Sequence, residues 1–535
     1  MVVALAALVA PALSAPRALA DTAPPPGVPA TVTADALPTV QVDGIVWSQA
    51  TVGDTVYAVG DFDNARPAGS APGHDLIPRA NILAYDLRSG RLIRSFNHAL
   101  NGPARSVAVT PDGSTVVVGG NFTQVDGRPL AYLAAFDVQT GALRSHFAPS
   151  VNGLVTAVAA GDNAVWFGGL FTAVGGQDRL HVAAVTLAAG RPTPFRATID
   201  DYGINAVAVT RNRVVVGGRF TSVNHQWAKG AAILDAQTGA SLPFPGDQVL
   251  SNGGEQAGTL SLKTDGRLVY GASWQYTGGH FEGTWAVDPA TGQLAWANDC
   301  HGDTYDIAPI GPVLYVASHV HDCQAIDGFP NAFVGAYNQQ WPAIAVTTGA
   351  STAYNQAPDA WGWDFSTTHR STLLTFYPTF TNGSIDGQAT WSVTGNARYV
   401  SYGGEFPSVN GVAQQGLVRF AISARAPDRM GPKLPAFRAS AASAPAAGQP
   451  HAVHLAWSTQ NWDPDNADLR YQVTRDNAVV FTSGPVTTQF WTYTSSPDGS
   501  WTDLGAAPGA HTYRVWAVDP AGNKQASDPI TVTVP

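Results

Sequence analysis

The sequence of 535 residues contains little charge. Asp, Glu, Lys and Arg together make up 13% of it, about half the share usual in soluble domains. Only four residues are Lys, and the formal net charge is -10. Proteins that bind nucleic acid through its phosphates carry a basic surface. We therefore expect no nucleic-acid partner.

Long apolar segments are also scarce. After residues 1–20, no stretch approaches the roughly 20 apolar residues that span a bilayer. Residues 1–20 are themselves interrupted by two prolines and end in Ala18-Leu19-Ala20, the small-x-small pattern at which signal peptides are cleaved. We expect a signal peptide at 1–20, an extended Pro-rich segment at 21–35, and no membrane span in the mature form. The protein is then secreted, and is extracellular or associated with the cell envelope.

The abundant residue types indicate strands. Hydrophobic residues make up 45% of the chain, which also has 15 Trp, 16 Tyr, 21 Phe, 55 Gly and 38 Pro. Aromatic residues favour strands over helices, and Gly and Pro favour the turns between short strands. The composition predicts an all-β protein with a large apolar core.

A unit of about 50 residues recurs along the chain. In its clearest copies Phe122, Phe171 and Phe220 hold the same position. Weaker copies begin near residues 45, 259, 303 and 388. Each copy divides into four short strands separated by turn sequences, as at residues 106–110, 116–123, 132–137 and 142–148. Four strands per unit of this length are typical of a β-propeller blade, so residues 36–424 predict a seven-bladed propeller, with six or eight blades left open.

The ends of the repeat predict how the ring closes. The seventh copy stops near Ile422 after three strands, while residues 36–44 resemble the fourth-strand segment of the second copy. We expect this N-terminal strand, residues 37–42 in particular, to complete the last blade and remove its exposed edge. Gly119 and Gly120 mark a place where a side chain would obstruct a neighbouring blade.

A different pattern follows the repeat. Residues 425–450, rich in Pro, Ala and Ser, are expected to form a linker to residues 451–535. There, Leu504, Pro508-Gly509, Tyr513 and the motif Ala-Val-Asp-x-Ala-Gly-Asn at 517–523 have a spacing that resembles a fibronectin type III domain. The resemblance implies a β-sandwich in which Tyr513 is the tyrosine-corner residue.

The repeats themselves resemble a known family. The recurring V-G-G-x-F-T-x-V-(N/D)-G, followed by L-A-A-F-D-x-x-T-G-x-L and joined to a type III domain, is similar to secreted propeller proteins of actinobacterial type. It is also similar to the propellers of fungal cortical cell-polarity markers. The resemblance implies an extracellular or surface protein of this shape, and it implies no particular reaction.

Cys300 and Cys323 are the only cysteines. In an exported protein, an even pair flanking one predicted hairpin is most simply a disulfide.

A cluster of imidazole and carboxylate groups surrounds the cysteine pair. Its candidate metal ligands are His301, Asp303, His319 and His321. Aligning His319 with Asn121 of the second copy places it on the same propeller face as the loop that carries His301. Such groups would suit a divalent metal, Zn²⁺ or Ca²⁺. The alternative is a polar rim in which the histidines bond loop carbonyls.

The sixth unit contains an insertion rich in aromatic residues. Trp361, Trp363 and His369 would suit stacking against a sugar and hydrogen bonding to its hydroxyls. The alternative is that the rings of the insertion fill the gap between the sixth and seventh blades. These rings include Trp341, Phe365, Phe376 and Tyr377.

Residues 463–468 (Asp-Pro-Asp-Asn-Ala-Asp) match the start of a calcium loop. They lack the Gly at the sixth position and the closing Glu. We expect an ordinary loop between sandwich strands.

No strong catalytic motif accompanies these features: G-x-S-x-G, P-loop and H-E-x-x-H patterns are absent from the sequence. We expect a non-enzymatic binding or adhesion protein whose propeller face engages an extracellular glycan or protein. The alternative is a secreted hydrolase acting on polysaccharide, with a metal ion at the histidine cluster. A structural envelope protein is the third hypothesis.

Overall fold

The computed structural model describes residue 24 and residues 27–199, 202–276, 280–334, 337–356, 363–434, 437–445, 448–459, 461–491 and 498–535. Within these ranges the only helices are α1 (Asp247–Leu250) and a 3-10 helix at Gln324–Ile326, so the predicted all-β class is confirmed. Neither helix could cross a membrane. The predicted signal peptide lies outside the described residues.

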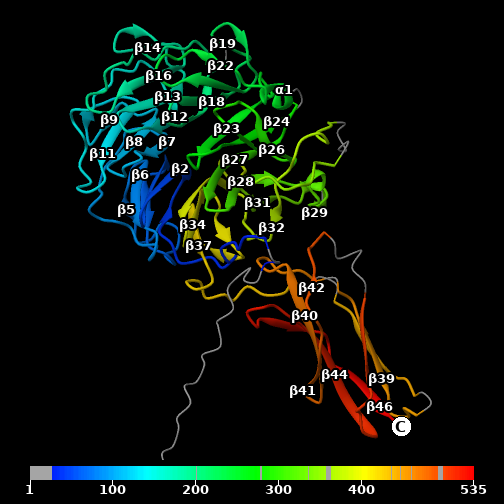
Figure 1. Ribbon diagram of the computed structural model, residues 1–535. Coiled ribbons are helices and arrows are strands. Elements are labelled where there is room, and N and C mark those ends of the chain that lie inside the picture. The colour runs from blue at the N-terminus through cyan, green and yellow to red at the C-terminus, as the bar shows by residue number, and fades with distance from the viewer. Residues whose placement is uncertain are drawn as a thin grey trace, which may run out of the picture.

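The described part of the repeat region forms seven main antiparallel sheets of three or four strands, accompanied by smaller sheets of two or three short strands (Figure 1). Their first strands are β2 (Ile45–Val52), β7 (Ala104–Val109), β12 (Val155–Ala160), β17 (Ile204–Val209), β23 (Ala257–Thr264), β27 (Thr304–Ile310) and β33 (Thr390–Asn396). Their second strands are β3 (Thr55–Asp61), β8 (Thr115–Gly120), β13 (Ala164–Gly169), β18 (Arg213–Gly218), β24 (Val269–Gln275), β28 (Val313–Val320) and β34 (Tyr399–Gly404). Their third strands are β6 (Ile82–Asp86), β11 (Leu133–Asp137), β16 (Val182–Thr186), β21 (Ala231–Asp235), β25 (Gly283–Val287), β31 (Trp341–Thr347) and β37 (Leu417–Ala421).

Further short strands lie toward the outside of these sheets. Regular fourth strands in the described residues are β22 (Ser241–Leu242), β26 (Leu294–Asp299) and β32 (Leu373–Leu374). Small hairpins between second and third strands are β4 (Asn64–Arg66) with β5 (Ile77–Pro78), β9 (Gln124–Val125) with β10 (Arg128–Pro129), β14 (Ala173–Val174) with β15 (Gln177–Asp178), β19 (Ser222–Val223) with β20 (Gln226–Trp227), β29 (Phe333–Val334) with β30 (Tyr337–Asn338), and β35 (Ser408–Val409) with β36 (Val412–Ala413).

The first strands are arranged in a ring. Each contacts the first strand of the next sheet, and β33 of the last sheet contacts β2 of the first. In Figure 1 the chain accordingly passes from blue through green to yellow and returns beside the blue strands. Sheets arranged radially around a central channel define a β-propeller. The ring of sheets confirms the predicted propeller architecture.

Every first strand carries a β-bulge at the same place. One residue is skipped in the register between, for example, Ala104 and Ser106, and the same shift occurs in the other six sheets of the described chain. A bulge turns the extra residue away from the regular alternation of a strand. The bulged residues are Trp47, Arg105, Thr156, Asn205, Leu260, Tyr305 and Trp391.

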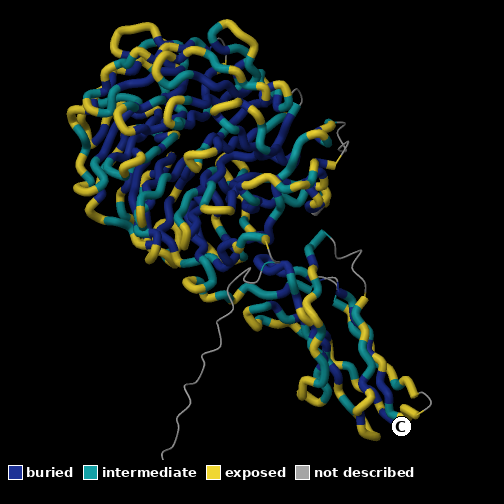
Figure 2. The backbone as a smooth tube through the Cα atoms, in the orientation of Figure 1, coloured by how far each residue is buried: buried dark blue, intermediate teal, exposed yellow. Residues whose placement is uncertain are grey.

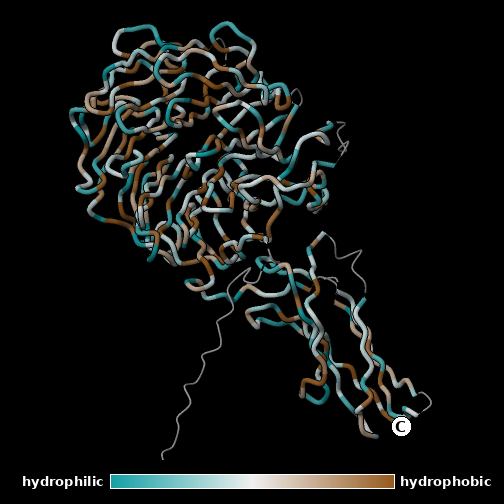
Figure 3. The backbone as a smooth tube through the Cα atoms, viewed as in Figure 1, coloured by the Kyte–Doolittle hydropathy of each residue, from teal (hydrophilic) through white to brown (hydrophobic). Residues whose placement is uncertain are grey.

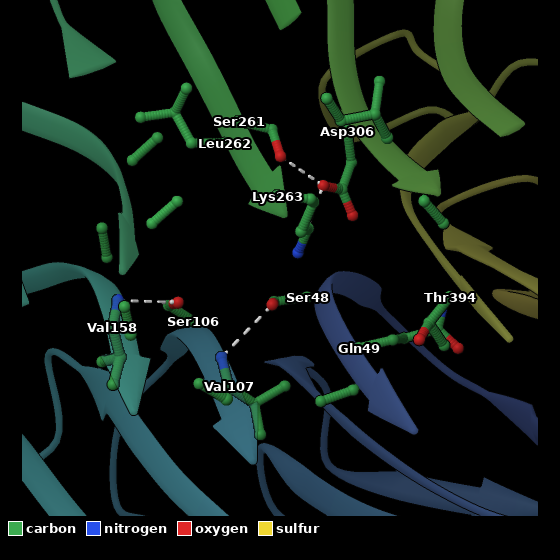
Figure 4. A pocket seen from close by; sticks show the side chains of 18 of the residues that line it. Ser48, Gln49, Ser106, Val107, Val158, Ser261, Leu262, Lys263, Asp306 and Thr394 are labelled. Atoms are coloured by element: carbon green, nitrogen blue, oxygen red, sulfur yellow. Dashed lines mark hydrogen bonds and ion pairs between the residues drawn. The ribbon is translucent and has the colours of Figure 1, made fainter. Parts of the chain in front are cut away.

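The residue after the bulge fastens one sheet to the next. Ser48 Oγ accepts a hydrogen bond from the backbone N–H of Val107 at 3.2 Å, and Ser106 Oγ accepts one from Val158 at 3.1 Å (Figure 4). In the sixth sheet, Asp306 Oδ2 accepts the N–H of Val393 at 3.0 Å. These bonds satisfy the backbone donors that the bulges free from the strand ladder.

The buried residues follow the strands, whereas exposed residues gather in the loops (Figure 2). Hydrophobic residues likewise lie mainly along the strands (Figure 3). The predicted crowding at the glycine pair is confirmed, because a Cβ atom on Gly119 would lie 2.5 Å from Cγ1 of Val155 in the next sheet. Glycine at this position therefore allows adjacent sheets to pack face to face.

The N-terminal segment joins the last sheet to the first. Thr33 and Leu37 donate backbone hydrogen bonds to Ala421 and Arg419 of β37, both at 2.9 Å. Further along, β1 (Gln41–Val42) pairs with β4, and together with β5 these strands form a separate small sheet beside the first one. Residues 37–42 therefore pair with the last sheet only in part: Leu37 bonds to β37, and Val42 N–H donates to the carbonyl of Gln415 just before β37 at 3.4 Å, whereas the strand pairing of residues 41–42 is with β4.

A buried carboxyl group fastens α1, which lies in the chain between the fourth and fifth sheets, to the residues just before β21 of the fourth sheet. Asp247 is 3% exposed, and burial raises its pKa to about 7. Its Oδ2 accepts the N–H of Lys229 at 2.9 Å, while its Oδ1 has no partner among the described residues.

Asp247 predicts a dependence of stability on pH. Its folded-state pKa lies above the value of 3.8 for the free side chain, so the native state holds the proton more tightly. The free energy of unfolding should therefore fall as pH rises from about 4 through about 7. Asp247→Asn should remove this part of the decline and stabilise the protein at pH 8. Denaturant titrations at about pH 4 and at pH 8 measure the free energy of unfolding of the wild type and the variant. If the free energy of unfolding of the variant falls with pH as steeply as that of the wild type, Asp247 is not the source of this pH dependence.

The C-terminal region forms two antiparallel sheets around one apolar core. One sheet contains β38 (Ala439–Ser443), β39 (Val453–Trp457) and β43 (Gly499–Asp503). The other contains β40 (Asp468–Arg475), β41 (Ala478–Thr482), β42 (Val486–Thr487), β44 (Gly509–Val518), β45 (Lys524–Ala526) and β46 (Ile530–Val534). Because β38 pairs with β39, residues 425–450 include a strand of this unit and do not consist of linker alone.

Two residues of the fibronectin-like pattern have unexpected surroundings. The Tyr513 hydroxyl donates to the Asp503 carboxylate at 2.9 Å, whereas a tyrosine corner bonds to backbone upstream. Leu504 is 57% exposed. Asp503 also pairs with Arg475 at 2.6 Å, so the same carboxylate oxygen accepts from both side chains.

The two units pack against each other through aromatic side chains. Trp341 of the propeller stacks on Phe490 of the sandwich with ring centroids 4.3 Å apart, and it contacts Trp462 edge-on. The backbone N–H of Tyr377 donates to the carbonyl of Pro464 at 2.8 Å. Part of the predicted insertion thus forms the junction with the sandwich.

Candidate functional site

A cavity of about 520 Å³ lies between the seven first strands (Figure 4). All seven bulged residues line it. Lys263 Nζ and Asp306 Oδ1 lie 3.4 Å apart on its wall, and Ser261 Oγ donates to the same carboxylate oxygen at 2.5 Å. The charges of Lys263 and Asp306 inside the cavity are therefore paired with each other. Groups available to bind a ligand lie at the mouth of the cavity.

The bulged residues make one side of the mouth aromatic. The Arg105 guanidinium lies 4.5 Å from the Trp47 ring centroid. Trp47 and Trp391 have centroids 4.9 Å apart, and Trp391 and Tyr305 have centroids 4.3 Å apart. The Tyr305 hydroxyl is 2.6 Å from Nδ1 of His319. We call Arg105, Trp47, Trp391, Tyr305 and His319 the rim arc.

The rim arc combines apolar rings with hydrogen-bonding groups. Trp47 and Trp391 are half-buried, and their indole N–H groups have no partner among the described residues. An unpaired buried donor costs free energy, which a bound acceptor would recover. The opposite side of the mouth carries Thr156, Asn205 and Leu260, so the mouth is markedly asymmetric.

A pair of carboxyl groups lies behind the rim arc. Glu282, which directly precedes β25, contacts Nδ1 of His301 at 3.4 Å. Asp303 forms a side-chain hydrogen bond with Glu282, and burial together with that carboxyl raises the pKa of Asp303 to about 7. The pair therefore retains a proton near neutral pH and can both donate and accept hydrogen bonds.

The two histidines of β28 and the loop after it are held neutral. Burial lowers the pKa of His319 and of His321, although the charge of Glu282 opposes this shift in both. Their rings stack with centroids 6.4 Å apart. Neutral imidazoles can accept as well as donate hydrogen bonds.

The predicted disulfide between Cys300 and Cys323 is present. It ties the loop that carries His301 to the loop that carries His321. His301 N–H donates to the carbonyl of Asp322 at 2.7 Å, and His321 N–H donates to the carbonyl of His301 at 2.8 Å. The register of β27 with β28 places His319 where Asn121 lies in the second sheet. His319 N–H donates to the carbonyl of Asp303 at 3.0 Å, so the end of β28 lies beside the loop that carries His301, as the alignment predicts.

The predicted metal ligands lie close together but are not gathered around one point. Within the described ranges, one group of three or more His, Cys, Asp or Glu residues has ligand atoms all within 4.8 Å of one another, and it lies elsewhere. His301 faces Glu282 and lies 3.9 Å from Asp299, and His319 faces Tyr305 and Gln388. A metal at His301, Asp303, His319 and His321 stays a prediction without geometric support.

The predicted sugar-stacking residues are divided among different partners. Trp361 lies outside the described residues. Trp363 meets His280 edge-on at 4.7 Å, and His369 stacks on Tyr354 at 4.2 Å. Ligand binding by these residues stays a prediction. Trp363 packs against the core of the fourth and fifth sheets, so it does not fill the gap between the sixth and seventh blades either.

The sequence did contain a signal for the rim arc. Across the seven copies, the position before the Ser, Ala or Asp of the first strand varies among Trp, Arg, Thr, Asn, Leu and Tyr. Variation of this kind, next to a position restricted to Ser, Ala or Asp, indicates a side chain that packing does not constrain. Glu282 had no comparable signal, since it precedes its strand in a copy that has lost the repeat motif.

Comparisons with known proteins assign this chain neither a family nor a function. No family model matches the chain, and no curated protein matches it in sequence. A chain in a crystal structure of the mitotic checkpoint complex is 12% identical, with a TM-score of 0.39 over 78% of this chain and 99% of that one. The β-propeller domain of the trilobed protease from Pyrococcus furiosus is 9% identical, with a TM-score of 0.35 over 70% of this chain and 95% of that one.

Proposed function

We propose that residues 36–424 are a closed seven-bladed propeller, and that residues 451–535 with β38 are a fibronectin type III sandwich. The contacts around the ring and the bonds of Thr33 and Leu37 to β37 support closure. The two sheets around one core support the sandwich.

We infer that the protein is a secreted or cell-surface binding protein without enzymatic activity, and that its propeller face engages an extracellular glycan. The rim arc carries this proposal. Its aromatic faces suit the C–H surfaces of sugar rings, and Arg105 with the neutral imidazoles suits hydroxyl groups. The net charge of -10 favours a neutral or cationic glycan over a polyanionic one.

Replacement of Trp391 tests this proposal. The purified protein is screened against immobilised cell-wall and capsular glycans, and Kd is measured for the best ligand. Trp391→Ala should weaken binding at least tenfold, about 1.4 kcal/mol, because it removes the central ring of the rim arc.

Trp227→Ala is the matched control. Trp227 is 50% exposed on β20 and should leave Kd unchanged. Equal effects of the two substitutions, or binding to no glycan in the screen, would contradict the proposal. Binding that resists removal of glycans from the target surface would identify a protein partner instead.

The Asp303–Glu282 pair supports a second candidate function. A carboxyl group that keeps its proton near neutral pH is suited to general acid catalysis of glycoside hydrolysis. Hydrolysis of the bound glycan by the wild type, lost in Asp303→Asn while Kd is retained, would establish it.

A further inference from the structure

Three distant segments bring carboxyl groups together between the propeller and the sandwich. Asp35 belongs to the N-terminal segment, Asp428 follows β37, and Asp465 lies in the loop before β40. One oxygen from each lies within 4.8 Å of the others. Ca²⁺ binds oxygen at about 2.3–2.6 Å, so one ion could touch all three atoms.

A fourth carboxyl group has an unused oxygen here. Asp463 is fully buried, and its Oδ1 accepts the backbone N–H groups of Asp465 and Asn466, both at 3.1 Å. Its Oδ2 has no partner among the described residues. The Asp463 carboxyl lies beside that of Asp465, and its charge contributes to raising the pKa of Asp428. Asp463 therefore adjoins the cluster, although it is not one of the three residues whose oxygens all lie within 4.8 Å of one another. Asp428 Oδ1 is likewise buried without a partner.

The cluster has no compensating positive charge. Among the described residues, no Lys, Arg or His forms an ion pair with any of the four carboxyl groups. Burial raises the pKa of Asp428 to about 6 and the pKa of Asp465 well above its usual value. Buried carboxylates without a counter-charge are costly, and a divalent cation would remove that cost.

Neighbouring bonds already organise the three segments around this point. Asp465 Oδ2 accepts the N–H of Ala34 at 2.6 Å, and Asp35 Oδ2 accepts the N–H of Arg429 at 2.7 Å. The Asn523 amide donates to the carbonyls of Asp428 at 3.1 Å and Met430 at 2.9 Å. The carboxyl groups are therefore positioned by both units of the protein.

We propose that Asp35, Asp428, Asp463 and Asp465 bind one Ca²⁺ ion that fastens the sandwich to the propeller. The site is separate from the glycan site proposed above. Donors that are all oxygen favour Ca²⁺ over Zn²⁺, and an irregular set of carboxylates favours it over Mg²⁺, which demands octahedral geometry. Asp463 and Asp465 match the first and third positions of a calcium loop, and Asp35 and Asp428 supply ligands that the loop itself lacks.

Titration of the metal-free full-length protein with Ca²⁺ tests the proposal. Calorimetry should detect one equivalent, and a hundredfold excess over Kd should raise the unfolding midpoint by about 5 °C. Terbium(III) should bind at the same place and emit on excitation of Trp462, which adjoins Asp463 in the sequence. Asp463→Asn and Asp428→Asn should each weaken binding at least tenfold. Asp528→Asn removes one exposed carboxylate from the sandwich and should have no effect.

Two results would overturn the proposal. One is the absence of heat and of any midpoint shift in the folded wild type at about 5 mM Ca²⁺, above the range typical of extracellular sites; the carboxyl groups would then share protons. The other is binding that both substitutions leave unchanged. If Asp463→Asn fails to fold, Asp428→Asn at the half-buried position decides the outcome.

Discussion

Trp285→Ala should lower the free energy of unfolding of the propeller by about 3–5 kcal/mol. Trp285 is completely buried in β25, within an apolar cluster that includes Phe281 and Phe365. Its indole N–H donates to Ser273 Oγ at 3.0 Å. Its ring lies so close to Gly271 that a Cβ atom there would fall 2.1 Å from it. Removing the ring leaves a cavity that the surrounding strands cannot close, and it removes the indole donor to Ser273 Oγ.

Denaturant unfolding followed by circular dichroism measures this loss. Trp227→Ala is the control, because Trp227 is half exposed and its removal should change stability by less than about 0.5 kcal/mol. A loss below about 1 kcal/mol for Trp285→Ala would show that the fifth sheet is packed less tightly than described.

Removing the disulfide should have the second largest effect. Cys300→Ala combined with Cys323→Ala should lower the free energy of unfolding by about 3 kcal/mol, because the bond restricts a loop of about 24 residues in the unfolded chain. The same change should weaken glycan binding, since the bond holds the loop of His301 against the loop of His321 behind the rim arc. Urea titration and the glycan assay measure the two consequences.

Wild-type protein that has been fully reduced before titration is the control. It should unfold at the same urea concentration as the double variant, and both should differ from the oxidised wild type. Identical midpoints for all three would show that the bond adds no stability.

Much of the architecture could be predicted because it depends on residues close in the chain. The spacing of Phe122, Phe171 and Phe220 reflects similar blades, so one correctly aligned copy places the first three strands of the others. The predicted fourth strand is regular in only three of the described sheets, and at residues 142–148 only an isolated bridge from Leu143 to Phe136 forms. Cys300 and Cys323 flank one hairpin, and antiparallel pairing brings the ends of a hairpin together. The face on which His319 lies follows from the same alignment.

The candidate site was only partly predictable. A period of two along a strand does not specify a bulge, and the bulge is what turns Trp47, Trp391 and Tyr305 toward the mouth of the cavity. Trp341 and Tyr377 are aromatic residues of the kind that sugar-binding loops contain, but in the structure they contact the sandwich. Whether an aromatic side chain meets solvent or a second domain depends on that domain's position, which no local pattern records.

The sequence alone therefore determined the strand class, the repeating unit and the pairing of the cysteines, since each follows from the spacing of residues within one or two hairpins. Only the tertiary structure decided which side chains share the cavity mouth and which carboxyl groups meet at the junction. Asp35 and Asp428 lie at opposite ends of the propeller sequence, and they become neighbours because the N-terminal segment returns to the last sheet. Contacts of this kind depend on how the ring closes, and that is a property of the whole chain.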